Sequence, residues 1–95
     1  MQLIGRELLQ EFMCIHADAR SQLGSWEAEV EAAEWKTPHD VKSRYPSVSL
    51  PGNQQAIFNI CWNKYRLWTT ITYKTGIVLV KKLGTHEEYK KWKII

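Results

Sequence analysis

The first third of the chain carries apolar residues at the three- and four-residue steps of two amphipathic helices. One stripe predicts a helix over residues 6–14. The other predicts a second helix, and the Asp18 carboxylate would cap it by accepting from the exposed N–H groups of its first turn. The two stripes are Leu8, Leu9, Phe12 and Ile15, followed by Leu23, Trp26, Val30 and Ala33. We expect an antiparallel helix pair joined near residues 16–17, with a short edge strand at residues 1–4 before it.

Turn-forming residues dominate the middle of the chain. Thr37 followed by Pro38 indicates a helix start, because threonine caps a helix and proline in its first position loses no hydrogen bond. Further along, Tyr45-Pro46 and Pro51-Gly52-Asn53 are turn sequences. We therefore expect residues 36–53 to form a basic loop with one short helix.

From residue 55 onward the apolar period changes to two, which predicts strands over residues 56–60, 65–73 and 77–83. Hairpin-turn sequences separate them, so the three strands should form an antiparallel meander. Alternation in the middle strand predicts one face that packs on the helices and one that is wet, cationic and aromatic. The first face carries Tyr65, Leu67, Thr69, Ile71 and Tyr73, and the second carries Arg66, Trp68, Thr70, Thr72 and Lys74.

The end of the chain predicts a last helix. Thr85 and Glu88 form a capping box, in which each side chain bonds the other residue's unpaired N–H. His86 and Tyr89 then lie on one side of its first turn, and the helix is expected to continue through a basic end formed by Lys90, Lys91 and Lys93. The predicted class is α+β: two N-terminal helices packed on a curved antiparallel sheet, followed by a short C-terminal helix.

Composition adds limits to this picture. The chain has 95 residues, of which 44% are hydrophobic and 24% charged, as expected for one globular domain over residues 1–95. No apolar run approaches the roughly 18 residues of a membrane span, and we expect no signal peptide, because Gly5-Arg6-Glu7 interrupts the apolar start. Cys14 and Cys61 lack disulfide or zinc spacing, and the three histidines are scattered, so we expect a cytoplasmic protein without a metal or cofactor.

Charge is divided unevenly along the chain. Residues 1–35 hold two basic and seven acidic side chains, a net charge of −5, whereas residues 36–95 hold eleven basic and three acidic ones, a net charge of +8. A half this basic attracts polyanions through steering and counterion release, although a solvated lysine-rich surface would have the same composition.

The basic half contains the groups that metal-free RNA cleavage needs, namely Lys64, Arg66, Lys81, Lys82, His86 and Tyr89. His86 can exchange a proton near neutral pH, and Arg66 can hold two phosphate oxygens in its planar fork. Tyr89 can stack on a base or pass a proton, and the lysines can neutralise a leaving oxygen. Each also has a structural explanation: a surface histidine, an arginine paired with a carboxylate, and a core tyrosine. Trp62, Trp68 and Trp92 can be stacking platforms, although most of five tryptophans in a small domain belong to the core.

Several segments of the chain together resemble the HigB-type toxins of bacterial toxin–antitoxin systems. They are Trp35-Lys36-Thr37-Pro38, Asp40-Val41-Lys42, Tyr45-Pro46-Ser47, Gly52-Asn53, Phe58-Asn59-Ile60, Asn63-Lys64-Tyr65-Arg66-Leu67 and Gly84-Thr85-His86-Glu87-Glu88-Tyr89. The resemblance implies a RelE-like fold and an mRNA interferase that acts on translated message at the ribosome. It also implies neutralisation by a helix-turn-helix, HigA-like antitoxin, with DNA contacted only through that partner.

The resemblance implies functional roles for motif residues. Arg66, His86 and Tyr89 would be catalytic, joined by Lys82 from its position on the neighbouring strand. The RNA-binding residues would be Asn63, Lys64, Trp68, Lys81, Lys90 and Lys91. Two positions depart from the family pattern: Cys61-Trp62 stands where small residues usually precede the asparagine, and Lys90 stands where an aspartate often follows the tyrosine.

Two other functions fit the same residues. A helix, three antiparallel strands and a lysine-bearing helix is also the order of a double-stranded-RNA-binding domain, which binds without cutting. A toxin-like protein that has lost its activity and serves only as an antitoxin partner is the other alternative.

Overall fold

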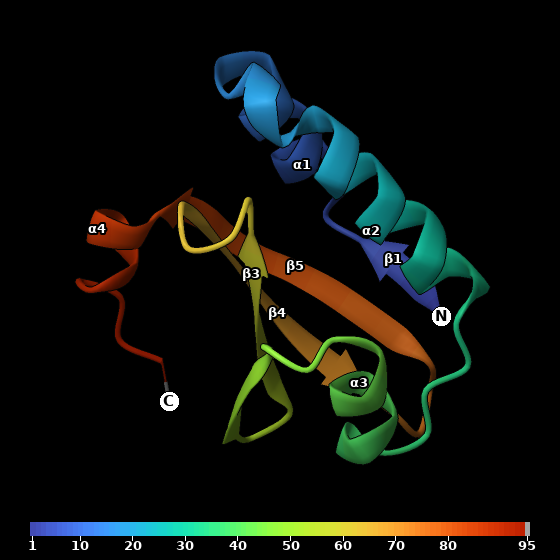
Figure 1. Cartoon of the computed structure of the whole chain (residues 1–95). Helices are drawn as coiled ribbons and strands as arrows, with labels where there is room; N and C mark the ends of the chain where they lie inside the picture. Colours follow the sequence, from blue (N-terminus) through green and yellow to red (C-terminus); the bar gives the residue numbers. More distant parts are fainter. Residues whose placement is uncertain (95) are drawn as a thin grey trace.

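A mixed five-stranded sheet lies at the centre of the computed structural model, which describes residues 1–94 (Figure 1). The strands are β1 (Gln2–Ile4), β2 (Ser49–Gly52), β3 (Gln55–Ile60), β4 (Tyr65–Thr72) and β5 (Ile77–Thr85), in the order β1-β5-β4-β3-β2. The helices are α1 (Arg6–Ile15), α2 (Arg20–Ala32), α3 (Pro38–Arg44) and α4 (His86–Tyr89), with a 3₁₀ turn η1 (Ala17–Ala19) between the first two. Within residues 1–94, every helix is too short or too polar to cross a bilayer.

The N-terminal helices form where the apolar stripes predict them, but Asp18 does not cap the second one. It lies inside η1, and no side chain caps the start of α2. The helix needs no cap there because the chain enters it through a continuous turn, in which the Ala19 N–H donates to the His16 carbonyl. The Asp18 carboxylate instead accepts from Lys64 and Tyr65 of the β3–β4 hairpin.

The antiparallel meander β3-β4-β5 is present as predicted, and two edge strands change the rest of the sheet. β1 pairs in parallel with β5, Leu3 opposite Val78, so the expectation of an antiparallel sheet is wrong. β2 pairs antiparallel with β3, although its residues were expected to be loop. Its Pro51 and Gly52 disfavour a strand in general, yet an edge strand tolerates a residue without an N–H donor. α3 begins as predicted, with Thr37 and Asp40 forming a capping box.

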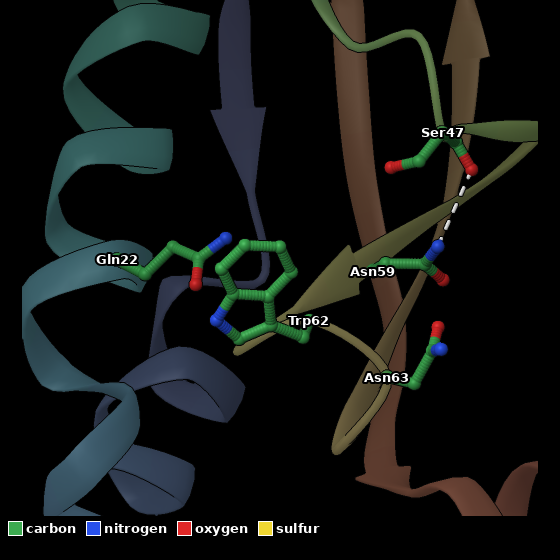
Figure 2. A pocket seen from close by; sticks show the side chains of 5 residues that line it. All are labelled: Gln22, Ser47, Asn59, Trp62 and Asn63. Carbon is green, nitrogen blue, oxygen red and sulfur yellow. Dashed lines mark hydrogen bonds between the residues drawn. The ribbon is translucent and has the colours of Figure 1, made fainter.

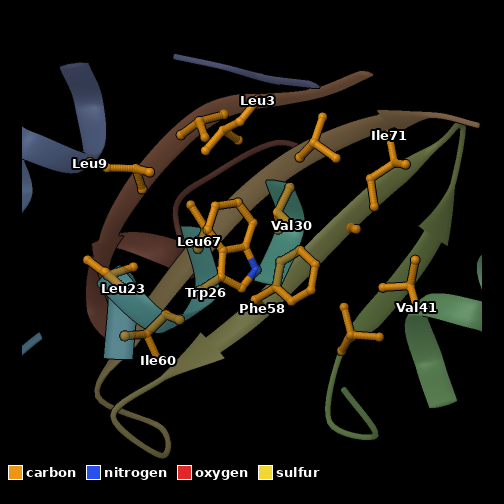
Figure 3. Close-up of a cluster of buried hydrophobic side chains, with 14 of the residues drawn as sticks. Leu3, Leu9, Leu23, Trp26, Val30, Val41, Phe58, Ile60, Leu67 and Ile71 are labelled. Carbon is orange, nitrogen blue, oxygen red and sulfur yellow. The ribbon is translucent and has the colours of Figure 1, made fainter. Parts of the chain in front are cut away.

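The core lies between one face of the sheet and the helices (Figure 3). Leu23, Trp26 and Val30 of α2 are buried, which confirms the predicted stripe, and the Trp26 ring meets Phe58 of β3 edge-on at 5.3 Å between centroids. Burial of each such side chain contributes roughly 1.5–3 kcal/mol. The helices cover this face, and the C-terminal segment lies on the opposite, outer face.

Candidate functional site

The C-terminal segment turns back onto the outer face of β4 and β5. α4 has only four residues. The prediction that the helix continues through Lys90 and Lys91 is therefore wrong. Beyond the helix, Trp92 packs closely on β5: a Cβ added at Gly84 would lie 2.8 Å from Trp92 Cζ2. The Trp92 ring stacks on Trp68 of β4, with centroids 5.9 Å apart and planes 28° from parallel.

This segment covers Arg66, which sequence alternation placed on a wet face. Arg66 does point to that face, but only 8% of its surface is exposed. Its guanidinium carbon lies 5.3 Å from the Tyr89 ring centroid, and Nη1 donates to the Tyr65 carbonyl at 3.2 Å. Within residues 1–94, no carboxylate forms an ion pair with it. A buried cation without an anionic partner is costly, and a bound anion would offset that cost.

His86 begins α4 beside the same tyrosine. Its ring centroid is 6.3 Å from that of Tyr89, and its backbone N–H donates to the Lys64 carbonyl at 3.1 Å, which fixes α4 to the end of the hairpin. The Nδ1 atom is buried without a hydrogen-bond partner among the described residues. Nε2 is therefore the ring nitrogen left to meet a ligand.

A β-bulge places two neighbouring lysines together on the outer side. Trp68 pairs with Lys82 and Thr69 with Val80, so Lys81 is an extra residue in β5. Consecutive residues in a regular strand point to opposite faces, but here both ammonium groups reach the stacked tryptophans. Lys81 Nζ lies 5.2 Å from the Trp68 ring centroid, and Lys82 Nζ lies 5.5 Å from that of Trp92.

The structure thus brings four cationic or titratable side chains together with three aromatic rings. We call this group the aromatic–cationic cluster: Arg66, Trp68, Lys81, Lys82, His86, Tyr89 and Trp92. Nearby carboxylates are engaged elsewhere. Hydrogen bonds from the Thr85 backbone lower the pKa of Glu88, with a further contribution from the charge on Lys82, and Glu87 pairs with Lys90 at 3.3 Å. Among residues 1–94, no three histidine, cysteine or acidic side chains are grouped so as to hold a metal ion.

Other sequence-predicted residues lie outside the cluster. Lys64 forms an ion pair with Asp18, so its charge is already matched, and Lys90 is paired with Glu87. Lys91 is exposed in the turn after α4. Asn63 lies at the tip of the hairpin, in a separate pocket.

That pocket, of about 560 Å³, lies beside the β3–β4 hairpin (Figure 2). We call it the hairpin pocket; it is lined by Gln22, Ser47, Asn59, Trp62 and Asn63. Sequence reasoning selected Asn63 among the binding residues and named Trp62 as a possible stacking platform. The remaining residues come from three separate segments, and no spacing in the sequence indicates that α2 reaches the hairpin.

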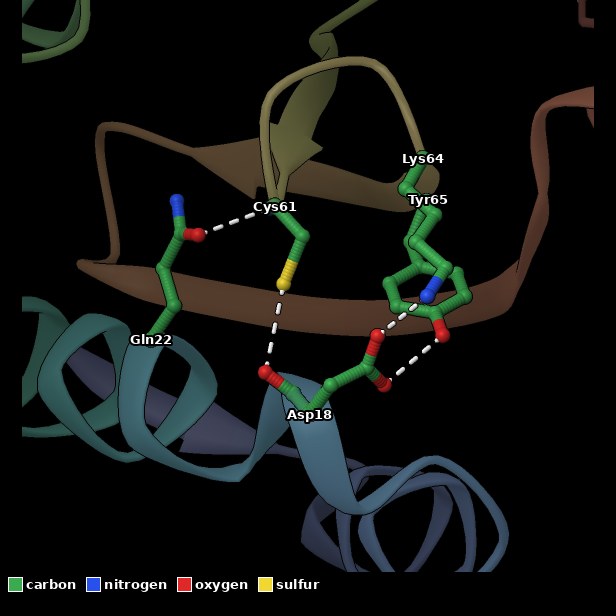
Figure 4. Close-up of polar contacts among 5 residues, drawn as sticks. All are labelled: Asp18, Gln22, Cys61, Lys64 and Tyr65. Atoms are coloured by element: carbon green, nitrogen blue, oxygen red, sulfur yellow. Dashed lines mark hydrogen bonds and ion pairs between the residues drawn. The ribbon is translucent and has the colours of Figure 1, made fainter.

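A set of polar contacts anchors the hairpin to η1 and α2 (Figure 4). The Asp18 carboxylate accepts from Lys64 Nζ and from the Tyr65 hydroxyl at 2.8 Å. Gln22 Oε1 accepts from the Cys61 N–H at 2.7 Å, and the Cys61 thiol donates to the Asp18 carbonyl. The hydrogen bond from Lys64 holds the pKa of Asp18 below its ordinary value, and Asp18 in turn raises the pKa of Lys64.

We predict that Asp18→Asn lowers stability at neutral pH but not in strong acid. A carboxyl whose pKa is lower in the folded state stabilises the fold above its unfolded pKa of about 3.9. That contribution disappears as the pH falls through the lower folded value. Urea midpoints of parent and variant should therefore differ modestly at pH 7 and coincide at about pH 2. Glu34→Gln removes an exposed carboxylate without a described ion pair and should change the urea midpoint at neither pH. Equal midpoints for the parent and Asp18→Asn at pH 7 would contradict the prediction.

Comparison with known protein families shows which family the chain belongs to. The family model of the HigB toxin, described as the RelE-like toxic component of a toxin–antitoxin system, matches residues 19–92. The chain belongs to the HigB toxin family. No curated protein matches it significantly. The match spans α2, the sheet from β2 to β5 and the C-terminal segment, so it includes every residue of the aromatic–cationic cluster.

Family membership makes the chain a toxin with an antitoxin partner, in a family of RelE-like toxins that generally act as ribonucleases. Its α+β architecture with a mixed sheet is compatible with a RelE-like fold. Two of the HigB motif segments, residues 63–67 and 84–89, form the turn and second strand of the β3–β4 hairpin and the start of α4, and the His86–Lys64 backbone hydrogen bond joins them.

Proposed function

We propose that this HigB-family chain is a metal-independent endoribonuclease that cleaves mRNA on the translating ribosome. The single observation that carries the proposal is Arg66, a nearly buried guanidinium with no carboxylate partner among residues 1–94. Arginine matches the planar arrangement of two phosphate oxygens, and a phosphodiester would supply the missing negative charge. The family's general activity supports the same conclusion.

The proposed reaction uses the RNA strand's own nucleophile. The ribose 2′-oxygen loses its proton and attacks the adjacent phosphorus, while the bond from phosphorus to the 5′-oxygen breaks and that oxygen gains a proton. The products are a 2′,3′-cyclic phosphate and a 5′-hydroxyl end. The protein therefore has to move protons and stabilise negative charge, which need no metal.

Residues of the aromatic–cationic cluster divide these tasks. Arg66 would hold the phosphate oxygens as charge develops, and His86 Nε2 would exchange a proton with the reacting oxygens. Lys82 would stabilise the departing oxygen. Tyr89 lies beside both His86 and Arg66, and it would orient the guanidinium through its ring or pass a proton.

The rest of the cluster suits a single-stranded message. Trp68 and Lys81 offer an aromatic surface and a cation next to the reacting groups, a combination that binds unpaired RNA without requiring one sequence. The partners we propose are messenger RNA, the ribosome and a helix-turn-helix antitoxin through which DNA is contacted indirectly. The proposed location is the cytoplasm, where translation takes place.

The chemistry of the cut ends tests this proposal. The chain is expressed without antitoxin in a bacterial host, and total RNA is collected as growth stops. We expect new fragments with 5′-hydroxyl ends, which accept a sequencing adaptor only after treatment with a polynucleotide kinase. Fragments with 5′-phosphate ends would contradict attack by the 2′-oxygen. Growth arrest without new fragments would instead favour an RNA-binding module that does not cut.

A further inference from the structure

We propose that the hairpin pocket holds one unpaired RNA base, stacked on Trp62 and hydrogen-bonded by the amides of Asn59 and Asn63. The proposal rests on the proposed function in taking RNA as the ligand, and it adds a site that selects the base near the cut. Trp62 is the main contact surface of this site. It is 93% exposed, whereas Trp26 and Trp35 are 2% and 7% exposed in the core.

The backbone at Cys61 and Trp62 adopts an energetically unfavourable conformation, and the Trp62 ring is exposed to solvent. Cys61 and Trp62 have φ angles of 53° and 63°, in the left-handed region that residues other than glycine rarely enter. A residue keeps such a conformation only where its surroundings impose it. Here the surroundings are the contacts from Gln22 and Asp18 to Cys61. The Trp62 indole is therefore held exposed to solvent by a backbone conformation that is itself unfavourable. An aromatic ring held exposed in this way suits a binding surface.

The chemistry of the pocket favours a base over a phosphate. All five lining residues are uncharged, so the pocket has no cation to hold an anion. Three of them carry amides, each with both donor and acceptor groups, which match the mixed donors and acceptors on a base edge. Figure 2 shows the Asn59 and Asn63 amides close to each other on one side of the Trp62 ring.

Much of this hydrogen-bonding capacity is unused within residues 1–94. Asn59 Nδ2 donates one long bond to the Ser47 carbonyl at 3.4 Å, which leaves its carbonyl oxygen available. The Asn63 amide is exposed at the tip of the hairpin. Gln22 uses its oxygen to accept from Cys61, so its NH₂ group remains free to donate. A base seated on Trp62 would meet two donor groups, from Gln22 and Asn63, and two acceptors, from Asn59 and Asn63, without displacing any structural contact.

The pocket also lies next to the proposed cleavage site. Asn59 of β3 is directly opposite Arg66 of β4, so their side chains project from the same face of neighbouring strands. Adjacent strands are about 4.8 Å apart. Lys64, the residue after Asn63, accepts the backbone hydrogen bond from His86. A strand with its phosphate at Arg66 can therefore place a neighbouring base against Trp62.

Binding measurements on an inactive background test this pocket directly. In the His86→Ala variant, the affinities of four single-stranded homopolymeric oligonucleotides are measured by fluorescence anisotropy. We expect the added Trp62→Ala change to weaken binding of the preferred oligonucleotide about 5- to 100-fold, the value of one stacked base. Trp62→Phe should retain most of the affinity because it keeps an aromatic face. Ile4→Ala, at an exposed apolar residue on the opposite edge of the sheet, should change nothing.

Base selection has its own readout. Asn59→Ala and Asn63→Ala should reduce the difference in affinity among the four oligonucleotides and, in the active protein, spread cleavage over more sequences. Unchanged affinity, base preference and cleavage positions in Trp62→Ala would overturn the pocket while leaving the ribonuclease intact. Conversely, a parent that never cuts message but loses oligonucleotide affinity on Trp62→Ala would support the pocket and reject the ribonuclease. If Trp62→Ala weakens only antitoxin binding, the occupant is protein and the proposal fails.

Discussion

Replacing Arg66 by alanine is expected to lower message cleavage about 10²–10³-fold, the scale of losing one preorganised charge-stabilising group. The loss should be larger than for an exposed cation, because Arg66 is nearly buried and its charge is matched by no described carboxylate. Cleavage is measured on a translated message, as the rate at which full-length transcript disappears. Arg66→Lys should rescue the rate only in part, since an ammonium group cannot hold two phosphate oxygens in one plane.

Stability should respond differently from activity at this position. Removing a buried, unpaired cation relieves a desolvation cost, so Arg66→Met is expected to unfold at the same or a higher urea concentration than the parent. Arg44→Ala is the matched control: its guanidinium also lies over a tyrosine ring, 5.0 Å from Tyr45, but it pairs with Glu29 away from the cluster. It should cut message at the parental rate. A fully active Arg66→Ala variant would remove the main support for the ribonuclease.

Replacing His86 by alanine is the second large effect, with an expected loss of about 10²–10⁴-fold, the usual contribution of proton transfer by a positioned side chain. Removing the side chain leaves the hairpin contact intact, because the hydrogen bond to the Lys64 carbonyl comes from the His86 backbone. The cap of α4 also remains, since Thr85 and Glu88 form it. The variant should therefore fold normally and still bind RNA.

The dependence of the cleavage rate on pH separates proton transfer from a packing role. The pH–rate profile of His86→Ala should differ in shape from that of the parent, because one of the groups that transfer a proton is then missing. His39→Ala, at an exposed histidine on α3, provides the comparison and should retain both the rate and the profile. A His86 variant that loses activity while keeping the parental profile would indicate that the ring only packs on Tyr89.

Much of the fold follows from patterns that are local in the sequence. The helical stripes, the alternation of β3 to β5 and the capping boxes at Thr37 and Thr85 each depend on residues within a few positions of one another. The two edge strands do not depend on such local patterns. β1 joins the sheet in parallel with a segment more than 70 residues away, and β2 contains Pro51 and Gly52, so pairing with the rest of the sheet determines both.

The site is only partly predictable for a similar reason. Alternation correctly directs Arg66 and Trp68 to the outer face, but it does not show that Trp92 returns to cover that face. It also cannot locate the bulge that brings Lys81 beside Lys82. Lys64 is a motif residue whose charge is matched by Asp18, 46 positions away, and no local pattern indicates that pair. These features depend on how separate segments meet in three dimensions.

The extra residue in β5 makes the electrostatics of this surface depend on chain length as well as on residue type. Deleting Lys81, the extra residue of the bulge, would restore strict alternation and remove one of the two ammonium groups from the outer side. Conservative exchanges of either lysine would be tolerated far better than such a deletion. In laboratory evolution of this protein, single-codon losses near position 81 should therefore be rarer among active survivors than substitutions at the same place.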